Sequence, residues 1–138
     1  MAQEHLGLGP PTALTARALS RSGARDVSEY LRQVWREGRP ALLPPDVWDV
    51  AADGDAAALA VADRAAGSYA AAAASLVGRF GPVPEVVLAG RVLDPGHDLL
   101  HGRVAAAFRG SLPGVLVRRL GRPPVDGAVL LAHGMLDR

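Results

Sequence analysis

The sequence predicts an α/β protein, a helix-rich N-terminal half followed by a β-α-β-α unit. An apolar, β-branched run at residues 86–88 is entered through two prolines and stops at Ala89-Gly90. A run that short between turn residues is typical of a strand that is buried on both faces. A helical pattern at 98–109 and a second short apolar run at 115–120 follow it. A buried strand, a glycine that allows close approach and a following helix form the unit on which α/β proteins place ligands, at the carboxyl end of the strand.

The charge balance and the lack of cysteine limit which binding partners and which metal sites the chain can have. The 138 residues suit one domain, and 15 basic against 14 acidic side chains leave a net charge of +1. This balance provides no electrostatic footprint for nucleic acid or an anionic membrane. The absence of cysteine excludes disulfides and thiolate metal sites. We find neither a signal-peptide pattern nor an apolar run of membrane-spanning length, so we expect a cytoplasmic protein with no nucleic-acid or membrane partner.

Capping residues divide the first half into helices. Thr12 is a candidate N-cap for a short helix that ends near Ser22-Gly23. Asp26 and Glu29 form an Asp-x-x-Glu capping box for the next helix, which Gly38 ends. The apolar stripe of that helix comprises Val27, Tyr30, Leu31, Val34 and Trp35.

A longer helix follows a short one. Asp46 is a candidate cap for a further turn that carries Trp48. We interpret Trp48 and Trp35 of the preceding helix as core anchors. Asp55 then begins the longest helix candidate, residues 55–80, which Gly81 ends. Its alanines predict close packing against a sheet or another helix. The predicted stripe contains Leu59, Ala62, Ala66, Tyr69, Ala73, Leu76, Val77 and Phe80.

The second half contains the predicted β-α-β-α unit. After the strand at 86–88, a turn at 94–96 leads to a helix at 98–109. The strand at 115–120 includes Arg118 and Arg119, and its alternation places it nearer an edge. A final helix begins after two prolines. Its apolar positions are Val125, Ala128, Val129, Leu131 and Leu136, and those of the helix at 98–109 are Leu99, Leu100, Val104, Ala107 and Phe108.

Reactive side chains show no catalytic arrangement. His97 and His101 have the spacing of a zinc-binding helix, but His97 precedes the helix cap and no third ligand is patterned. We therefore interpret them as surface histidines and predict neither a metal site nor catalytic residues. Arg118, Arg119 and Arg122 form a small basic cluster, for which a solvated face is favoured over a phosphate clamp.

Several segments together resemble one protein family. They are Gly-Pro-Pro-Thr-Ala-Leu-Thr at 9–15, Val-Ala-Ala-Asp-Gly-Asp at 50–55 before the long helix, Val-Val-Leu-Ala-Gly at 86–90, and Pro-Val-Asp-Gly-Ala at 124–128. In this order they resemble the C-terminal part of the BadF/BadG/BcrA/BcrD ATPase family, which includes N-acetylglucosamine kinases. These proteins belong to the sugar kinase, heat-shock 70 and actin superfamily. The resemblance extends over nearly the whole chain.

This resemblance implies a fold and a site. The fold is a single actin-like (ribonuclease H-like) C-terminal subdomain over residues 1–138, and the cofactor is ATP with magnesium. The nucleotide-side wall contains Ala89, Gly90 and Arg91, and Gly127 on the last helix lines it further. Glycine lets the backbone approach the adenosine. Family members usually carry a second glycine where this chain has Arg91, a side chain that either obstructs the ribose or adenine or reaches a phosphate.

The resemblance also implies that a second part is needed. In this superfamily the N-terminal domain supplies the phosphate hairpin and the catalytic carboxylate, and no Asp-Gly-Gly-x-Thr stretch occurs here. Since phosphoryl transfer depends on those groups, we expect the nucleotide-side half of a kinase-like ATPase, inactive alone. Its partner is an N-terminal kinase half or a second copy of the chain. The alternative is a non-catalytic ligand-binding or interaction module derived from the same fold.

Overall fold

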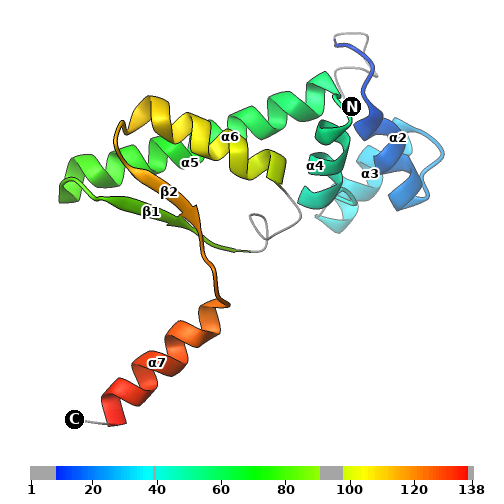
Figure 1. Ribbon diagram of the computed structural model, residues 1–138. Helices are drawn as coiled ribbons and strands as arrows, with labels where there is room; N and C mark the ends of the chain where they lie inside the picture. The colour runs from blue at the N-terminus through cyan, green and yellow to red at the C-terminus, as the bar shows by residue number, and fades with distance from the viewer. Residues whose placement is uncertain (1–8, 39, 91–97, 137–138) are drawn as a thin grey trace.

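Six helices and a two-stranded sheet make up the described part of the chain, residues 9–38, 40–90 and 98–136 of the computed structural model (Figure 1). The α/β class and the predicted order, four helices and then β-α-β-α, are confirmed. The elements are α2 (Ala13–Ser22), α3 (Val27–Glu37), α4 (Pro44–Ala52), α5 (Ala56–Phe80), β1 (Glu85–Leu88), α6 (Asp98–Ser111), β2 (Leu116–Arg119) and α7 (Pro124–Leu136).

The predicted caps begin α2 and α3. The Thr12 hydroxyl accepts a hydrogen bond from the Leu14 N–H at 3.2 Å, and the Asp26 carboxylate accepts one from the Glu29 N–H at 2.8 Å. The capping box is incomplete, because the Glu29 carboxylate accepts from the N–H of Arg25, one residue before the cap. Both helices end at a glycine with φ near +70°. This left-handed conformation is less favourable for a residue with a Cβ than for glycine.

Two predictions around α3 and α4 are wrong. Trp35 is 87% exposed rather than a core anchor, whereas Trp48 on α4 is buried as predicted. Helix α4 begins at Pro44, so Asp46 is its third residue rather than its cap. Proline suits the first helical position because that N–H has no intrahelical partner. The Asp46 carboxylate instead accepts the N–H of Leu43 at 2.9 Å.

The close contact of α5 with α6 organises the core. Four alanines at every fourth position of α5 are buried, and α6 presents larger apolar side chains to that region of the core. The predicted α5 stripe is therefore partly wrong: Tyr69, Leu76 and Phe80 are exposed. Small side chains let a neighbouring helix approach closely, so the alanines rather than the large residues mark the packed face. The buried set is Ala58, Ala62, Ala66 and Ala70 on α5 with Leu100, Val104 and Phe108 on α6.

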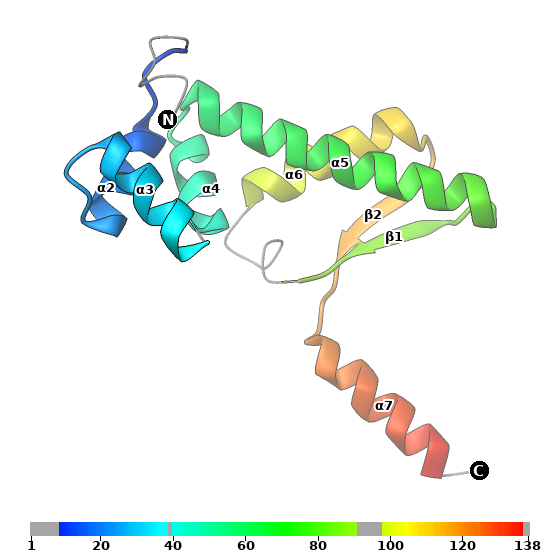
Figure 2. The same cartoon turned by 180° about the vertical axis from the view of Figure 1, so that it is seen from behind.

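Strands β1 and β2 pair in parallel, joined through α6. Helices α5 and α6 lie over one face of this sheet, and the opposite face is uncovered (Figures 1 and 2). The expectation that β1 is buried on both faces is wrong, because Glu85 and Val87 on the uncovered face are exposed. Two parallel strands establish the α/β class and no particular fold within it.

Helix α7 stands apart from the rest of the chain. It leaves β2 and projects away from the sheet and from the helices that cover it (Figures 1 and 2). Its exposed apolar residues are Val125, Val129, Leu130, Leu131 and Met135. Within the described residues, every helix is too short or too polar to cross a membrane.

Candidate functional site

The carboxyl ends of β1 and β2 lie at the same edge of the sheet. The register pairs Leu88 with Arg119, and the N–H of Leu120 donates to the carbonyl oxygen of Leu88 at 2.8 Å. Ala89 and Gly90 continue from β1 and are exposed. This edge is the position at which parallel sheets bind ligands, and we call it the strand edge.

Gly90 has a backbone conformation that favours glycine. Its φ of +106° is one that residues with a Cβ rarely adopt. A Cβ placed there would have no described neighbour within 4 Å, so the glycine is needed for the turn and leaves open space beside it. A ligand can therefore approach the backbone closely at this position.

The two arginines of β2, which the sequence placed in one basic cluster, lie on opposite faces of the sheet. Arg118 lies on the uncovered face, where its Nε donates to the Glu85 carboxylate at 2.8 Å. This hydrogen bond, with the charge of the guanidinium, lowers the pKa of Glu85 and raises that of Arg118. Arg119 lies on the face that the helices cover, and its Nη1 donates to Asp98 of α6 at 2.7 Å.

Arg119 also has spare hydrogen-bonding capacity. Its Nε and Nη2 are buried and have no hydrogen-bond partner among the residues that the structure describes. Buried donors of this kind are rare in folded proteins and call for a partner such as a ligand or an ion. The alternation of β2 signals this placement, since Arg119 shares a face with the partly buried Val117.

His101 contributes a third unpaired nitrogen at the same end of α6. It lies one helical turn after Asp98, and its Nε2 is buried without a described hydrogen-bond partner. His101 is partly exposed, so it lies at the surface as predicted with one ring nitrogen buried. His97 lies outside the described residues. Among those described, no group of three His, Asp or Glu side chains is arranged to hold a metal ion.

Of the remaining predicted site residues, only Gly127 falls within the described part of the chain. Arg91 lies outside the described residues. Gly127 is exposed in the first turn of α7, which leads away from the sheet (Figures 1 and 2). The strand edge thus combines the backbone at Ala89 and Gly90 with Arg119, and His101 lies on α6 one helical turn after the Asp98 that pairs with Arg119. This arrangement offers open backbone and unpaired nitrogens, which suit the binding of an anionic ligand.

Comparison with known proteins adds no assignment. The sequence matches no family model and no curated protein.

Proposed function

We propose that the chain is the nucleotide-side half of an N-acetylglucosamine kinase-like, BadF-type ATPase and folds as an actin-like C-terminal subdomain. The observation that carries the proposal is the parallel β1–α6–β2 unit, whose first strand ends at Gly90 with φ +106° and open space beside it. A backbone without a Cβ at the carboxyl edge of parallel strands suits close contact with an adenosine. The resemblance of segments 9–15, 50–55, 86–90 and 124–128 to the family supports the same function.

In this proposal the strand edge binds ATP with magnesium. The backbone at 88–90 lies against the adenosine, and the free nitrogens of Arg119 donate to a phosphate oxygen. A guanidinium suits that role because its planar fork matches phosphate geometry. Arg119 retains two buried nitrogens for it after pairing with Asp98 through the third.

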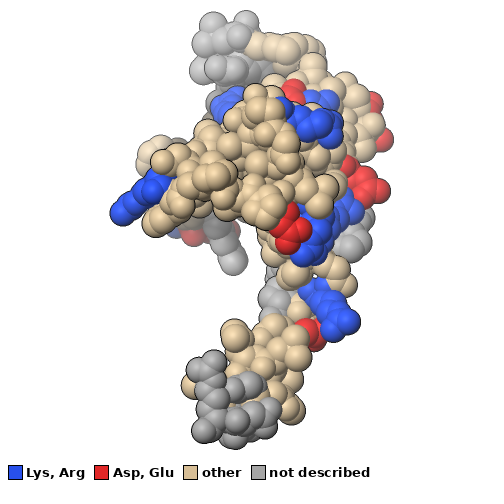
Figure 3. All heavy atoms as spheres, turned by 60° about the vertical axis from the view of Figure 1, so that its left-hand side comes forward, with Lys and Arg blue, Asp and Glu red and all other residues tan. Residues whose placement is uncertain are grey.

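The proposed catalytic unit needs a second part, here an N-terminal kinase half. Two surfaces support this requirement. The uncovered face of the sheet exposes Val87 and Leu116, although parallel sheets are normally covered on both faces. Helix α7 also exposes apolar side chains. In Figure 3 this helix forms the lower part of the molecule and shows few charged atoms, whereas the body above it carries charges of both signs. Unpaired apolar surface of this kind marks an interaction site.

Calorimetric titration of ATP with magnesium into the full chain tests the nucleotide site. We expect saturable binding that Gly90→Ala weakens, because a Cβ disfavours φ +106° and projects into the ligand space. Gly81→Ala is the matched control, since Gly81 has φ +95° and open surroundings at the opposite end of β1. Equal losses in the two variants would assign the effect to backbone strain and refute a site at Gly90.

Reconstitution tests the kinase lineage. The chain is mixed with the N-terminal half of an N-acetylglucosamine kinase of the family, and ATP-dependent sugar phosphorylation is assayed. We expect activity in the mixture that neither piece has alone. No gain over the separate pieces would contradict the assignment as a kinase half.

The alternative function is a non-catalytic ligand-binding or interaction module. Arg91 favours it, because a side chain stands where the family carries a second glycine. This alternative predicts that ATP with magnesium does not bind the wild-type chain and does bind Arg91→Gly. Binding to the wild type with no gain in Arg91→Gly would exclude it.

A further inference from the structure

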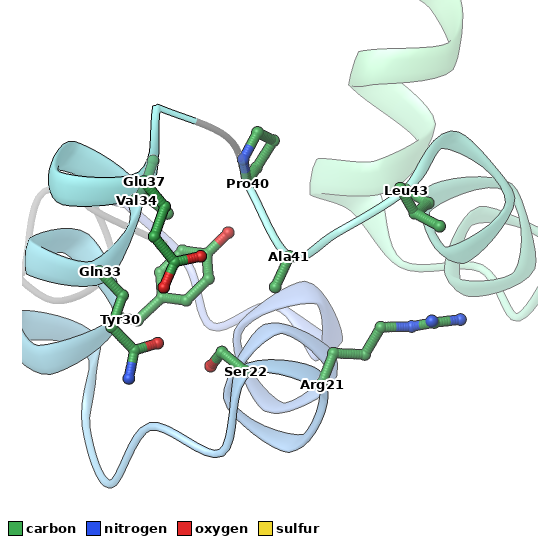
Figure 4. Close-up of a pocket in the computed structure, with 9 residues that line it drawn as sticks. All are labelled: Arg21, Ser22, Tyr30, Gln33, Val34, Glu37, Pro40, Ala41 and Leu43. Atoms are coloured by element: carbon green, nitrogen blue, oxygen red, sulfur yellow. The ribbon is translucent and has the colours of Figure 1, made fainter.

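A pocket at the other end of the molecule is independent of the strand edge. Its volume is about 440 Å³, and it lies between α3, the last turn of α2 and the segment at 40–43 that enters α4 (Figure 4). It arises because α3 ends at Gly38 and the chain then passes back to α4. The volume is within the usual range for small-molecule sites.

Helix α3 supplies one polar wall of this pocket. Tyr30, Gln33 and Glu37 follow one another at three- and four-residue spacing and therefore share a face of the helix. Tyr30 is only 3% exposed, and its hydroxyl points toward the segment that carries Ala41 (Figure 4). Within the described chain none of these three side chains has a hydrogen-bond or ion-pair partner. The Tyr30 ring is buried while its hydroxyl oxygen opens to the pocket, so it can accept a hydrogen bond from a ligand there.

The positive charge at the pocket is already neutralised. Arg21 lines it, but its Nε donates to the Asp46 carboxylate at 2.7 Å, and Asp46 is 1% exposed. The Arg21 guanidinium is directed toward α4, away from Glu37 (Figure 4). Among the described residues that line the pocket, Glu37 therefore carries the charge that no ion pair balances, a negative one.

We propose that this pocket binds a small organic cation, a primary ammonium group on a short hydrocarbon chain. An ammonium has three N–H donors and no acceptor. The α3 wall offers the matching acceptors: the Glu37 carboxylate, the Gln33 carbonyl oxygen and the Tyr30 hydroxyl oxygen. The hydrocarbon chain lies against Val34 and Leu43 on the pocket lining. No residue of this site belongs to the strand edge, so the proposal stands whether or not ATP binds there.

An NMR titration of the full ¹⁵N-labelled chain with butylammonium chloride tests this site. We expect saturable shifts of the amides of residues 30–38 and 41, and at least about tenfold weaker binding of 1-butanol and of butyrate. Glu37→Gln should weaken butylammonium binding about tenfold, because it removes a charge-assisted hydrogen bond, and Tyr30→Phe about threefold. Higher ionic strength should weaken it further.

Asp49→Asn is the matched control, since Asp49 is an exposed carboxylate on α4 that does not line the pocket. It should leave the affinity unchanged. Glu37 is exposed in the last turn of α3, so Glu37→Gln retains the fold even if Tyr30→Phe loosens it. The proposal is overturned if butylammonium gives no saturable shifts, if 1-butanol or butyrate binds as tightly, or if Glu37→Gln binds like the wild type.

Discussion

Asp55 joins two helices, and its replacement should therefore be costly. Its carboxylate caps α5 by accepting the N–H of Ala58 at 2.9 Å. The same side chain accepts the N–H of Ala13, the first residue of α2, at 2.8 Å and the hydroxyl of Thr12 at 2.9 Å. Thr12 is itself buried. Asp55 thus links the start of α2 to the start of α5 across more than forty residues of sequence.

We expect Asp55→Ala to destabilise the chain by about 3 kcal/mol. Loss of the cap costs about 1 kcal/mol. The two bonds to α2 are formed with an ionised acceptor, and at a partly exposed site we assign them about 1 kcal/mol each. Asp55→Asn should cost less, about 1 kcal/mol, because asparagine retains an acceptor oxygen and is a good cap. Urea unfolding monitored by circular dichroism measures both differences.

The pH dependence separates the charge from the cap. Burial, the largest effect, raises the pKa of Asp55, but the hydrogen bonds from Ala58, Ala13 and Thr12 together bring it below its ordinary value. A lowered pKa in the folded state stabilises the protein above the unfolded-state pKa, near 4. This contribution is lost as the pH falls through the folded-state pKa. The advantage of the wild type over Asp55→Asn should therefore be full at pH 7 and shrink below about pH 4. An equal difference at pH 3 and pH 7, or Asp55→Ala within about 0.5 kcal/mol of the wild type, would refute the reasoning.

Three further predictions concern the core and α7. Phe108→Ala should lower the free energy of unfolding by about 3–5 kcal/mol, because it opens a cavity under α6; a loss below about 1 kcal/mol would contradict the packing. Ala62→Leu should cost about 1–3 kcal/mol through overpacking, whereas Ala60→Leu on the exposed side of α5 should change stability by less than about 0.5 kcal/mol; urea unfolding that finds similar effects for both would exclude the assigned face. Light scattering should find that the wild-type chain self-associates and that the double variant Leu130→Ser/Leu131→Ser does so less; a monodisperse wild-type monomer would exclude α7 as an interface between copies.

Local signals in the sequence predicted the helices and most of their ends. Thr12, Asp26 and Asp55 have side-chain acceptors that satisfy the first N–H groups of a helix, and the glycines at 23 and 38 adopt the conformation that ends one. These interactions lie within a few residues of one another, so the sequence contains them. The order of helices, strand, helix, strand and helix follows from the same signals.

Burial depends on neighbours that the sequence does not identify. Trp35 follows the helical stripe of α3 and is nevertheless exposed, since α2 packs against the side of that helix that contains Tyr30. On α5 the large residues suggested the core face, whereas α6 packs on the alanines. The unpaired nitrogens of Arg119 and His101 arise where β2 meets the start of α6. The alternation within β2 predicts the face of Arg119, but its partners come from another element.

The most direct test of the nucleotide site is an NMR titration of the ¹⁵N-labelled full chain with ATP and magnesium. We predict saturable shifts of the amides of residues 88–90, together with a change at the Arg119 Nε–H signal. Arg119→Gln should weaken the binding about tenfold, because it removes a charge-assisted contact with phosphate. Saturating shifts confined to other parts of the chain, or no saturable binding by either the wild type or Arg91→Gly, would contradict a nucleotide site at this edge.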